Sequence, residues 1–456
     1  MTNFIFYDLE TTGTNVVFDQ ILQFGAILTD RNLVELDRFD IRCQILPWIV
    51  PAPSALVVTA TDVDRLDDPA LPDFYSMMRE IFRRLNAWGT ATFVGYNSMP
   101  FDEPFLQRAF WQTLLPPYVT VTGGNGRLDL LPLLRATALF RPEVLTIPQR
   151  DDGVPTFRLD AMGPSNGFNA HNAHDAMGDV EATLFLARKL KAGFPDLWEK
   201  LVGRASKAGL TPLFDTPEPI YLFHHRAKEP MACYCRVDDG VRFHSHATLA
   251  RLSFNWKGAG APSEENTELM RRMLRRIALN KSPVVLTLAE AEGFAGITPT
   301  EGELAQASFL ADDRAYCANI AELIGPFSVL PAASDAQVEE AIFRGFPTAY
   351  DAELMTEFHR AAPQGQLSIA GAFRDNRFRR LAMRILYVQA PQILAPRETA
   401  QIGAAISRRL KGDPGGQLWR SLADAMTELA SSSAEMSSER KLRISEWLIE
   451  RASAEA

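Results

Sequence analysis

Two carboxylates stand two residues apart near the start of the chain. Asp8 and Glu10 follow the strand-like run 3–7 in the segment Asp8-Leu9-Glu10. Side chains two apart on a strand point to the same face, so both carboxylates would converge at the end of this strand. Clustered carboxylates supply the hard oxygen ligands that Mg²⁺ prefers. An isolated acidic pair is also common on solvated surfaces, so a metal site needs partners further along the chain.

A third carboxylate, that of Asp102, follows another strand-like run. The run 92–96 is followed by the segment 97–101, and Asp102 then comes directly before a helix predicted over 103–110. This position suits a third metal ligand. It suits equally an acid that stabilises the positive N-terminal end of the helix.

A histidine and a fourth carboxylate occur close together. His174 lies just before an amphipathic helix predicted over 176–190, and Asp179 lies inside its first turns. Asp175 is interpreted as the N-cap of this helix. Because His174 lies in the preceding loop, its ring can approach a common site without sharing the helix face of Asp179; His171 is a competing candidate.

Carboxylates and a histidine in this pattern indicate metal-dependent hydrolysis of a phosphodiester. The reaction must neutralise charge on the attacking and leaving oxygens, and two metal ions about 3.5–4 Å apart can clamp both. Histidine suits the general base because its ordinary pKa of about 6.5 lets it take a proton from water near neutral pH. Such a base typically contributes about 10²- to 10⁴-fold.

The elements that position these residues alternate between strands and helices. Strands are predicted over 3–7, 20–28, 39–42 and 92–96, and a further helix over 71–85. After about residue 195, prolines punctuate the chain before strand-like runs over 230–237 and 241–244. From Ala352 onward helix formers dominate. We therefore predict an α/β domain over 1–195, a β-rich domain over 196–350 and a helical domain over 351–456. The tail from Ser431 onward is polar and rich in Ser and Glu, and its last residues are expected to fray.

Composition excludes several classes of protein. The 456 residues exceed one ordinary core, and 46% hydrophobic with 23% charged residues is normal for folded proteins. Apolar runs are too short for a membrane span, and no secretory signal opens the chain, so a cytoplasmic protein is expected. The net charge of −9 requires that any nucleic-acid path be locally basic.

The cysteines do not indicate a disulfide framework. Cys43, Cys233, Cys235 and Cys317 are few and scattered, which favours buried thiols. Cys233 and Cys235 form a Cys-x-Cys pair without a second pair at structural zinc spacing. His244 and His246 lie nearby and keep a zinc site as the alternative.

The acidic motifs and the histidine resemble the DEDDh exonucleases. The order is Asp-x-Glu, then Asp, then His-x₄-Asp, which selects His174 with Asp179 over His171 with Asp175. The first motif, over 8–13, is similar both to proofreading exonuclease subunits of DNA polymerases and to exonuclease I. A related DEDDh nuclease that proofreads or acts on RNA therefore stays an alternative, as does a catalytically inert single-stranded DNA-binding protein.

Longer segments resemble bacterial exonuclease I more specifically. These are Arg141-Pro142-Glu143, the stretch 151–159, the stretch 172–177, Asn280 to Val284 and Phe343 to Phe346. The resemblance implies an RNase H-like, DnaQ-type α/β exonuclease domain, an SH3-like middle domain and a helical C-terminal domain. It implies a monomeric 3′-5′ exodeoxyribonuclease that degrades single-stranded DNA to 5′-mononucleotides in DNA repair and recombination.

The same resemblance assigns roles to individual residues. Asp8, Glu10, Asp102 and Asp179 would hold two Mg²⁺ ions, with Mn²⁺ able to substitute, and His174 would activate the attacking water. Glu10 would also touch the 3′-terminal nucleotide. Arg158 matches a family position that contacts DNA, and its guanidinium suits bidentate phosphate binding; a surface salt bridge is the alternative.

Two basic runs stand out in this acidic chain. One comprises Arg271, Arg272, Arg275, Arg276 and Lys281, and the other spans 374–384. Each suits a local positive groove or, alternatively, the solvated face of a helix. The family resemblance also implies binding of the acidic C-terminal tail of single-stranded DNA-binding protein, for which a basic pocket with apolar neighbours would be suitable.

Overall fold

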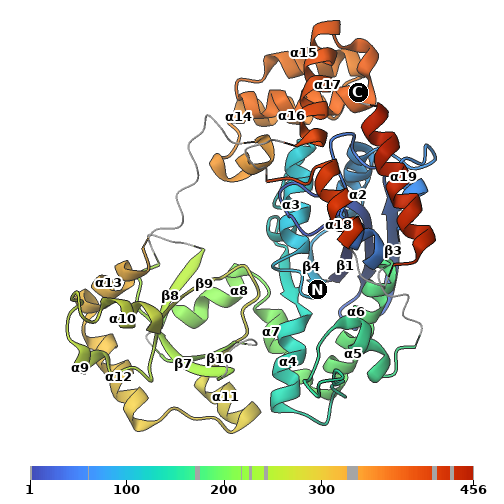
Figure 1. Ribbon diagram of the computed structural model, residues 1–456. Helices are drawn as coiled ribbons and strands as arrows, with labels where there is room; N and C mark the ends of the chain where they lie inside the picture. The colour runs from blue at the N-terminus through green and yellow to red at the C-terminus, as the bar shows by residue number, and fades with distance from the viewer. Residues whose placement is uncertain are drawn as a thin grey trace.

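A computed structural model describes most of the chain (Figure 1). The described residues are 3–59, 61–169, 175–216, 218–224, 229–240, 245–325, 337–412, 418–431 and 436–454. His171, His174 and the strand predicted over 241–244 lie outside these ranges. Within them, no helix has both the length and the apolar character to cross a membrane.

The N-terminal part is built on a five-stranded mixed sheet in the order β3-β2-β1-β4-β5. Its strands are β1 (Asn3–Thr11), β2 (Ile21–Thr29), β3 (Glu35–Arg42), β4 (Ala91–Gly95) and β5 (Gly126–Asp129). The first three strands pair antiparallel, whereas β4 pairs parallel with both β1 and β5. This is the mixed α/β architecture predicted from the sequence.

Strand β1 divides its side chains between two cores. Phe4 and Phe6 belong to the core that includes α6 (Ala176–Gly193), while Ile5 and Tyr7 belong to the core on the other face. Because side chains alternate along a strand, the even-numbered Asp8 and Glu10 continue the α6 face. The remaining helices of this part are α1 (Pro53–Val58), α2 (Phe74–Trp88), α3 (Asp102–Gln112), α4 (Leu130–Phe140), α5 (Leu159–Ser165) and α7 (Pro195–Gly203).

A second sheet lies in the β-rich part. It is five-stranded and antiparallel in the order β10-β6-β7-β8-β9. Its strands are β6 (Ile220–Phe223), β7 (Met231–Arg236), β8 (His246–Arg251), β9 (Leu274–Ala278) and β10 (Val285–Thr287). The helices around it are α8 (Lys207–Leu210), α9 (Trp256–Ala259), α10 (Thr267–Met273), α11 (Leu288–Ala295), α12 (Glu301–Asp312) and α13 (Arg314–Ala321).

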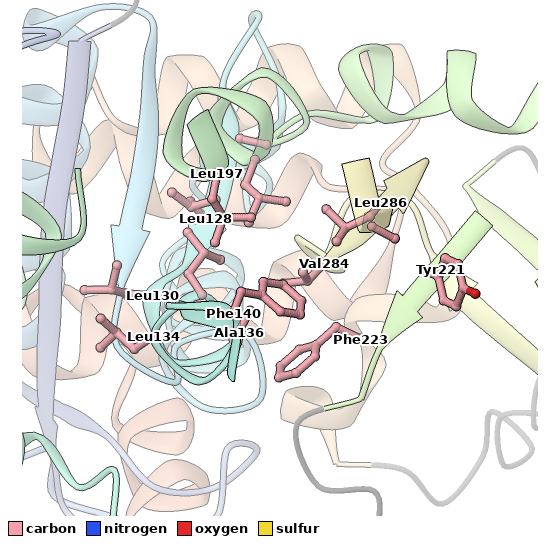
Figure 2. Close-up of a cluster of buried hydrophobic side chains, with 14 of the residues drawn as sticks. Leu128, Leu130, Leu134, Ala136, Phe140, Leu197, Tyr221, Phe223, Val284 and Leu286 are labelled. Atoms are coloured by element: carbon pink, nitrogen blue, oxygen red, sulfur yellow. The ribbon is translucent and has the colours of Figure 1, made fainter. Parts of the chain in front are cut away.

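One continuous apolar core joins the two sheets. Figure 2 shows Phe140 of α4 lying toward Phe223 of β6, with Leu134 on the far side of α4 and Leu286 of β10 on the β-rich side of the same cluster. The rings of Phe140 and Phe223 meet edge to face, with 6.2 Å between their centroids. Burial of such side chains favours one fixed arrangement of the two parts, since each apolar residue removed from water contributes about 1.5–3 kcal/mol.

The C-terminal part is helical in its described residues, as predicted. Its helices are α14 (Ala349–Phe358), α15 (Pro363–Ala372), α16 (Asn376–Gln389), α17 (Pro396–Lys411), α18 (Leu422–Ser431) and α19 (Ser438–Ala454). Within the polar tail, α19 returns along the N-terminal part (Figure 1). Ile444 and Leu448 are buried in the core of that part, and the Trp447 indole donates to Asp67 over 2.7 Å. These buried contacts hold α19 in place, while the last two residues of the chain, where fraying is expected, lie outside the described ranges.

The basic run 271–281 is a helix only in its first part. Helix α10 ends at Met273, and Arg275 and Arg276 lie on strand β9. The interpretation of this whole run as one solvated helical face is therefore wrong. In the second basic run the helix interpretation holds, because α16 begins at Asn376 and buries Phe378, Leu381 and Leu386 on one face.

Candidate active site

Asp8 and Glu10 occupy the inner strand of the first sheet. They lie on β1 beyond its pairing with β4, which covers Asn3 to Phe6, and opposite Gly25 and Gln23 of β2. Glu10 is buried and Asp8 is partly buried. The ladder changes register between Glu10 and Thr11, so the strand carries its two carboxylates just before it ends. The sequence prediction of converging carboxylates at a strand end is confirmed.

Asp102 is the first residue of α3 and is only 4% exposed. The loop that leads to it is held by Asp129 at the end of β5, whose carboxylate accepts from the amides of Asn97 over 2.8 Å and Met99 over 3.3 Å. Asn97 has a left-handed φ of 57°, which asparagine tolerates better than most residues. Asp102 is thus the acid at a helix N-terminus. It is also a neighbour of Asp8, since its charge raises the pKa of that carboxyl.

Asp179 lies in the first turn of α6, and the N-terminus of that helix is anchored to the sheet. Asp175 caps the helix as predicted, accepting from the amide of Met177 over 3.0 Å. The other oxygen of Asp175 pairs with Arg42 of β3 over 2.9 Å. Gln23 of β2 donates to Asp175 over 3.2 Å and accepts from the amide of Ala176 over 3.2 Å.

Three of the four predicted metal ligands form a tight group. Carboxylate oxygens of Asp8, Glu10 and Asp179 all lie within 4.8 Å of one another. Asp102 is outside this group, yet among the neighbouring charges it contributes most to the raised pKa of Asp8. The described part of the chain holds this acidic set at the meeting point of β1, α3 and α6.

The electrostatics of the group disfavour negative charge. Burial raises the pKa of Asp8 well above its usual range, and the charges of Asp102, Asp179 and Glu10 raise it further. Burial and the charge of Asp179 raise the pKa of Glu10 to about 8. Burial also raises the pKa of Asp102. Carboxylates crowded in this way need a compensating positive charge in order to ionise near neutral pH.

A divalent cation fits this donor set. The cluster supplies hard oxygen atoms from several elements, which matches the preference of Mg²⁺ and Mn²⁺ for carboxylate ligands. Arg42 compensates part of the charge at Glu10, but it also pairs with Asp175. The residues at the site therefore suit a metal ion that binds Asp8, Glu10 and Asp179.

Two other predicted site residues stand apart from this geometry. His174 lies outside the described residues, so its role as the general base stays a prediction. Arg158 is the N-cap residue of α5, and its side chain is 68% exposed. Its guanidinium pairs with Asp160 over 2.7 Å, which is the surface salt bridge considered as the alternative. An exposed arginine in such a pair can still exchange its partner for a phosphate, so DNA contact by Arg158 stays a prediction.

Sequence reasoning missed the residues that support the ligands. Gln23 and Arg42 contact Asp175 from neighbouring strands, and Asp129 holds the loop before Asp102. Their positions depend on strand register, which cannot be read from their spacing along the chain. For Asp129 a signal existed, because an acid directly before the apolar run 130–134 is typical of an N-cap.

Two family models match this chain in order. The model described as Exonuclease matches residues 5–186, which contain the whole carboxylate cluster. The model described as Exonuclease I C-terminal domain matches residues 336–451. The chain thus carries an exonuclease domain followed by an exonuclease I C-terminal domain. Of the two models, only the second is described as specific to exonuclease I.

Curated relatives agree with this placement. The chain is 28% identical over 402 residues to exodeoxyribonuclease I of Haemophilus influenzae, which covers 82% of the chain and 84% of that protein. It is 32% identical over 225 residues to exodeoxyribonuclease I of Escherichia coli, which covers 49% of the chain and 47% of that protein. The match to the E. coli enzyme thus spans less than half of its length.

Solved structures share the fold over the whole chain. E. coli exonuclease I in complex with a dA16 oligonucleotide superposes with a TM-score of 0.84 at 22% identity, covering 100% of both chains. A zinc-bound E. coli exonuclease I complex with single-stranded DNA has a TM-score of 0.82 at 21% identity, covering 100% of this chain and 99% of that one. A structure described as SSB/exonuclease I with inhibitor CFAM has a TM-score of 0.81 at 22% identity and covers 100% of both chains.

Proposed function

We propose that this chain is a 3′-5′ exodeoxyribonuclease that degrades single-stranded DNA to 5′-mononucleotides by two-metal hydrolysis, in DNA repair and recombination. The observation that carries the proposal is the group of Asp8, Glu10 and Asp179, whose oxygens lie within 4.8 Å of one another beside Asp102. The match to the exonuclease I C-terminal model and the complexes of similar proteins with single-stranded DNA support the choice of substrate.

In this proposal the residues divide the work of the reaction. Asp8, Glu10, Asp102 and Asp179 hold the metal ions. Bound Mg²⁺, or Mn²⁺ in its place, would neutralise the charge on the attacking and leaving oxygens. His174 takes a proton from the attacking water, and Glu10 additionally contacts the terminal nucleotide. Asp175, through Arg42 and Gln23, keeps the α6 N-terminus and hence Asp179 in place.

The middle and C-terminal parts complete the proposal. The antiparallel sheet β6–β10 supports an SH3-like domain over about 196–350, followed by a helical domain over 351–456. Helix α7 packs on the first sheet, since the rings of Phe4 and Trp198 lie 5.6 Å apart. We therefore propose that the boundary between the nuclease domain and the SH3-like domain lies at the end of α7, residue 203, and not at residue 195. A monomeric state follows from the resemblance, and it is part of the same proposal together with a cytoplasmic location.

A degradation time course tests the activity. The substrates are 5′-labelled single-stranded DNA, duplex DNA and RNA, each with Mg²⁺ or a chelator, and the variants are Asp8→Asn and Asp179→Asn. We expect stepwise shortening of single-stranded DNA alone, which stops with the chelator and with either variant. Preference for RNA would move the protein to the RNA-directed exonucleases. Binding of DNA without cleavage by the wild type would identify an inert binding protein.

The role of His174 needs its own experiment. A general base acts in the chemical step, so His174→Gln should lower kcat far more than it weakens DNA binding. Single-turnover rates and DNA affinity measured by fluorescence anisotropy separate the two effects. His171→Gln is the matched control, and it should leave kcat near the wild-type value. The reverse pattern would transfer the base role to His171.

We also propose that the chain binds the acidic C-terminal tail of single-stranded DNA-binding protein. A solved SSB/exonuclease I structure with this fold supports the proposal. Several arginines of the two basic runs form ion pairs within the chain, such as Arg272 with Glu268 and Arg377 with Asp375. An acidic peptide would have to compete with these carboxylates for the same guanidinium groups. Anisotropy with a labelled tail peptide tests binding, and a peptide with its acids replaced by amides is the control. Equal binding of both peptides would contradict an electrostatic pocket.

A further inference from the structure

Glu103, the residue after Asp102, is a charged side chain in an almost completely buried position. It is 1% exposed and lies in the first turn of α3. Its Oε1 accepts from the hydroxyl of Tyr7 over 2.6 Å. Its Oε2 accepts from the hydroxyl of Thr120 over 2.8 Å and from Nη1 of Arg127 over 2.6 Å. Both carboxylate oxygens are thus occupied by donors from three other elements.

The partners of Glu103 adjoin the metal-binding carboxylates. Tyr7 directly precedes Asp8 on β1, and Glu103 directly follows Asp102 on α3. The Tyr7–Glu103 hydrogen bond therefore ties the strand that carries one ligand to the helix that carries another. Because the hydroxyl and the carboxylate are both buried, little freedom remains for α3 to shift relative to β1.

Arg127 extends this network to the β-rich part. It is 3% exposed on β5, and its Nε and Nη2 both donate to the backbone carbonyl of Asn280, with 3.1 Å from Nε. Two positions further along β5, the amide of Asp129 contacts the hydroxyl of Ser282 over 3.3 Å. The turn 280–282 between β9 and β10 thus contacts both residues of β5 that support the Asp102 segment.

Stability alone does not explain a buried ion pair of this kind. Removing two charges from water costs about as much free energy as their attraction returns, and apolar replacements are often neutral or stabilising. What this pair does supply is a fixed geometry, since the planar guanidinium of Arg127 is shared between Glu103 and the carbonyl of Asn280, and both oxygens of Glu103 have donors. This geometry holds Tyr7 and Glu103, which are the chain neighbours of Asp8 and Asp102.

We infer that Glu103 is a positioning residue for Asp102, and that Arg127 links its position to the β9–β10 turn of the β-rich part. The inference rests on the proposed metal-dependent nuclease function. Outer residues that orient metal ligands typically change metal affinity or activity about 10- to 100-fold when they are replaced. Glu103→Gln should therefore weaken metal binding by that range, because the neutral amide no longer holds Arg127.

The test is calorimetric titration of the DNA-free, full-length protein with Mn²⁺, together with kcat, KM and Tm. A matched control is Glu290→Gln, which breaks another largely buried ion pair, between the residue after α7 and helix α11: Arg204 and Glu290 lie 2.8 Å apart, with side chains 10% and 11% exposed. We expect both variants to lower Tm. Only Glu103→Gln should weaken Mn²⁺ binding and lower kcat, while KM for DNA stays near the wild-type value.

Two further variants keep the inference testable. Arg127→Lys retains the charge but cannot serve Asn280 and Glu103 together, so it should also weaken Mn²⁺ binding. If Glu103→Gln does not fold, Tyr7→Phe removes only the hydroxyl that reaches Glu103 and should give a smaller loss of Mn²⁺ affinity. Wild-type Mn²⁺ affinity in all three variants would overturn the inference. Failure of the wild type to bind Mn²⁺ or to cleave DNA would instead overturn the proposed function.

Discussion

Gly25 of β2 lies directly against the backbone of Ala176 at the start of α6. A Cβ atom at Gly25 would lie 2.8 Å from the carbonyl carbon of Ala176 and 2.8 Å from the amide nitrogen of Met177. Gly25 also pairs with Asp8 across the sheet. The absence of a side chain at this position is therefore what lets the helix that carries Asp179 approach the strand that carries Asp8.

Gly25→Ala should push α6 away from the sheet and separate Asp179 from Asp8. The atoms that a Cβ would meet belong to the backbone, so no side chain can turn aside. A displacement of about 1 Å at a catalytic group costs about 100-fold, and we expect a loss of this size in kcat/KM on single-stranded DNA. Overpacking should also cost about 1–3 kcal/mol of stability, measured by urea denaturation.

Gly371→Ala is the control for this prediction. Gly371 lies at an exposed position of α15, and a Cβ there would meet no atom within 4 Å. The substitution should leave kcat/KM unchanged and stabilise the protein by about 0.4–1 kcal/mol. If Gly25→Ala behaves in the same way, α6 does not depend on close approach to β2.

Arg158→Ala should weaken binding of single-stranded DNA without lowering kcat at saturating DNA. If the guanidinium contacts one phosphate, the slope of log affinity against log salt should fall by about 0.7. Anisotropy titrations over a range of salt concentrations measure this slope. Arg150→Ala is a matched control, because Arg150 forms the same exposed pair with Asp152 over 2.9 Å. Equal losses of DNA affinity in both variants would show that Arg158 acts only through its surface charge and makes no specific phosphate contact.

The sequence was sufficient to predict the position of those site residues that depend on local rules. Asp8 and Glu10 share a face because strands have a period of two, and Asp175 caps α6 because its carboxylate reaches the amide of Met177. Both facts depend only on neighbours in the chain. The meeting of Asp179 with Asp8 is not local, and it was inferred from the order of motifs in a known family.

Strand β5 was not predicted from the sequence, and the reason is that it carries buried charge. Strand β5 has the sequence Gly-Arg-Leu-Asp, and its Arg127 and Asp129 are 3% and 4% exposed. Such residues are almost never buried without partners, so their sequence resembles a loop. The partners, Glu103 and the amides of the loop before Asp102, become visible only when the sheet is assembled. Arg275 and Arg276 were misread for a different reason: they continue the basic helical pattern of the residues before them, yet the chain passes from α10 into β9 at Leu274.

Asp8→Asn should abolish cleavage and yet stabilise the metal-free protein. Burial and neighbouring carboxylates raise the pKa of Asp8, so its charge opposes folding when no cation is bound. Relief of about 1 kcal/mol corresponds to about 1 °C when all 456 residues unfold together, and we expect a rise in Tm of this order with chelator present. With Mg²⁺ the order should reverse, because the wild type gains binding free energy that the variant lacks.

Calorimetric scans with Mg²⁺ and with chelator check this reversal. Asp152→Asn serves as the control, since the side chain of Asp152 is 59% exposed. Its replacement should change the free energy of unfolding by less than about 0.5 kcal/mol, so Tm should stay close to the wild-type value both with Mg²⁺ and with chelator. A lower Tm for Asp8→Asn in both conditions would show that Asp8 has a structural role beyond holding a metal ion.

Glu339 holds the C-terminal helices together through two arginines. Its side chain is 1% exposed, and its Oε1 lies 2.7 Å from Arg384 of α16 and 2.5 Å from Arg409 of α17. Burial raises the pKa of Glu339, but the charges and hydrogen bonds of Arg384 and Arg409 outweigh it and lower the pKa from 4.5 to about 2. Glu339→Gln leaves the buried guanidinium of Arg409 and the half-buried one of Arg384 without their counterion, which should cost about 3–5 kcal/mol at neutral pH.

This cost should depend on pH in a defined direction. A carboxylate whose pKa is lower in the folded state stabilises the protein fully above its unfolded pKa of 4.5 and loses that contribution as pH falls through about 2. The difference between these values corresponds to about 3 kcal/mol. The free-energy gap between wild type and Glu339→Gln, from urea denaturation, should therefore be constant above about pH 5 and more than halve by about pH 3. Glu80→Gln, which breaks the exposed pair with Arg83, should differ from wild type by under about 1 kcal/mol throughout. A Glu339 gap that stays constant or widens toward pH 3 would mean that the two arginines do not hold Glu339 ionised.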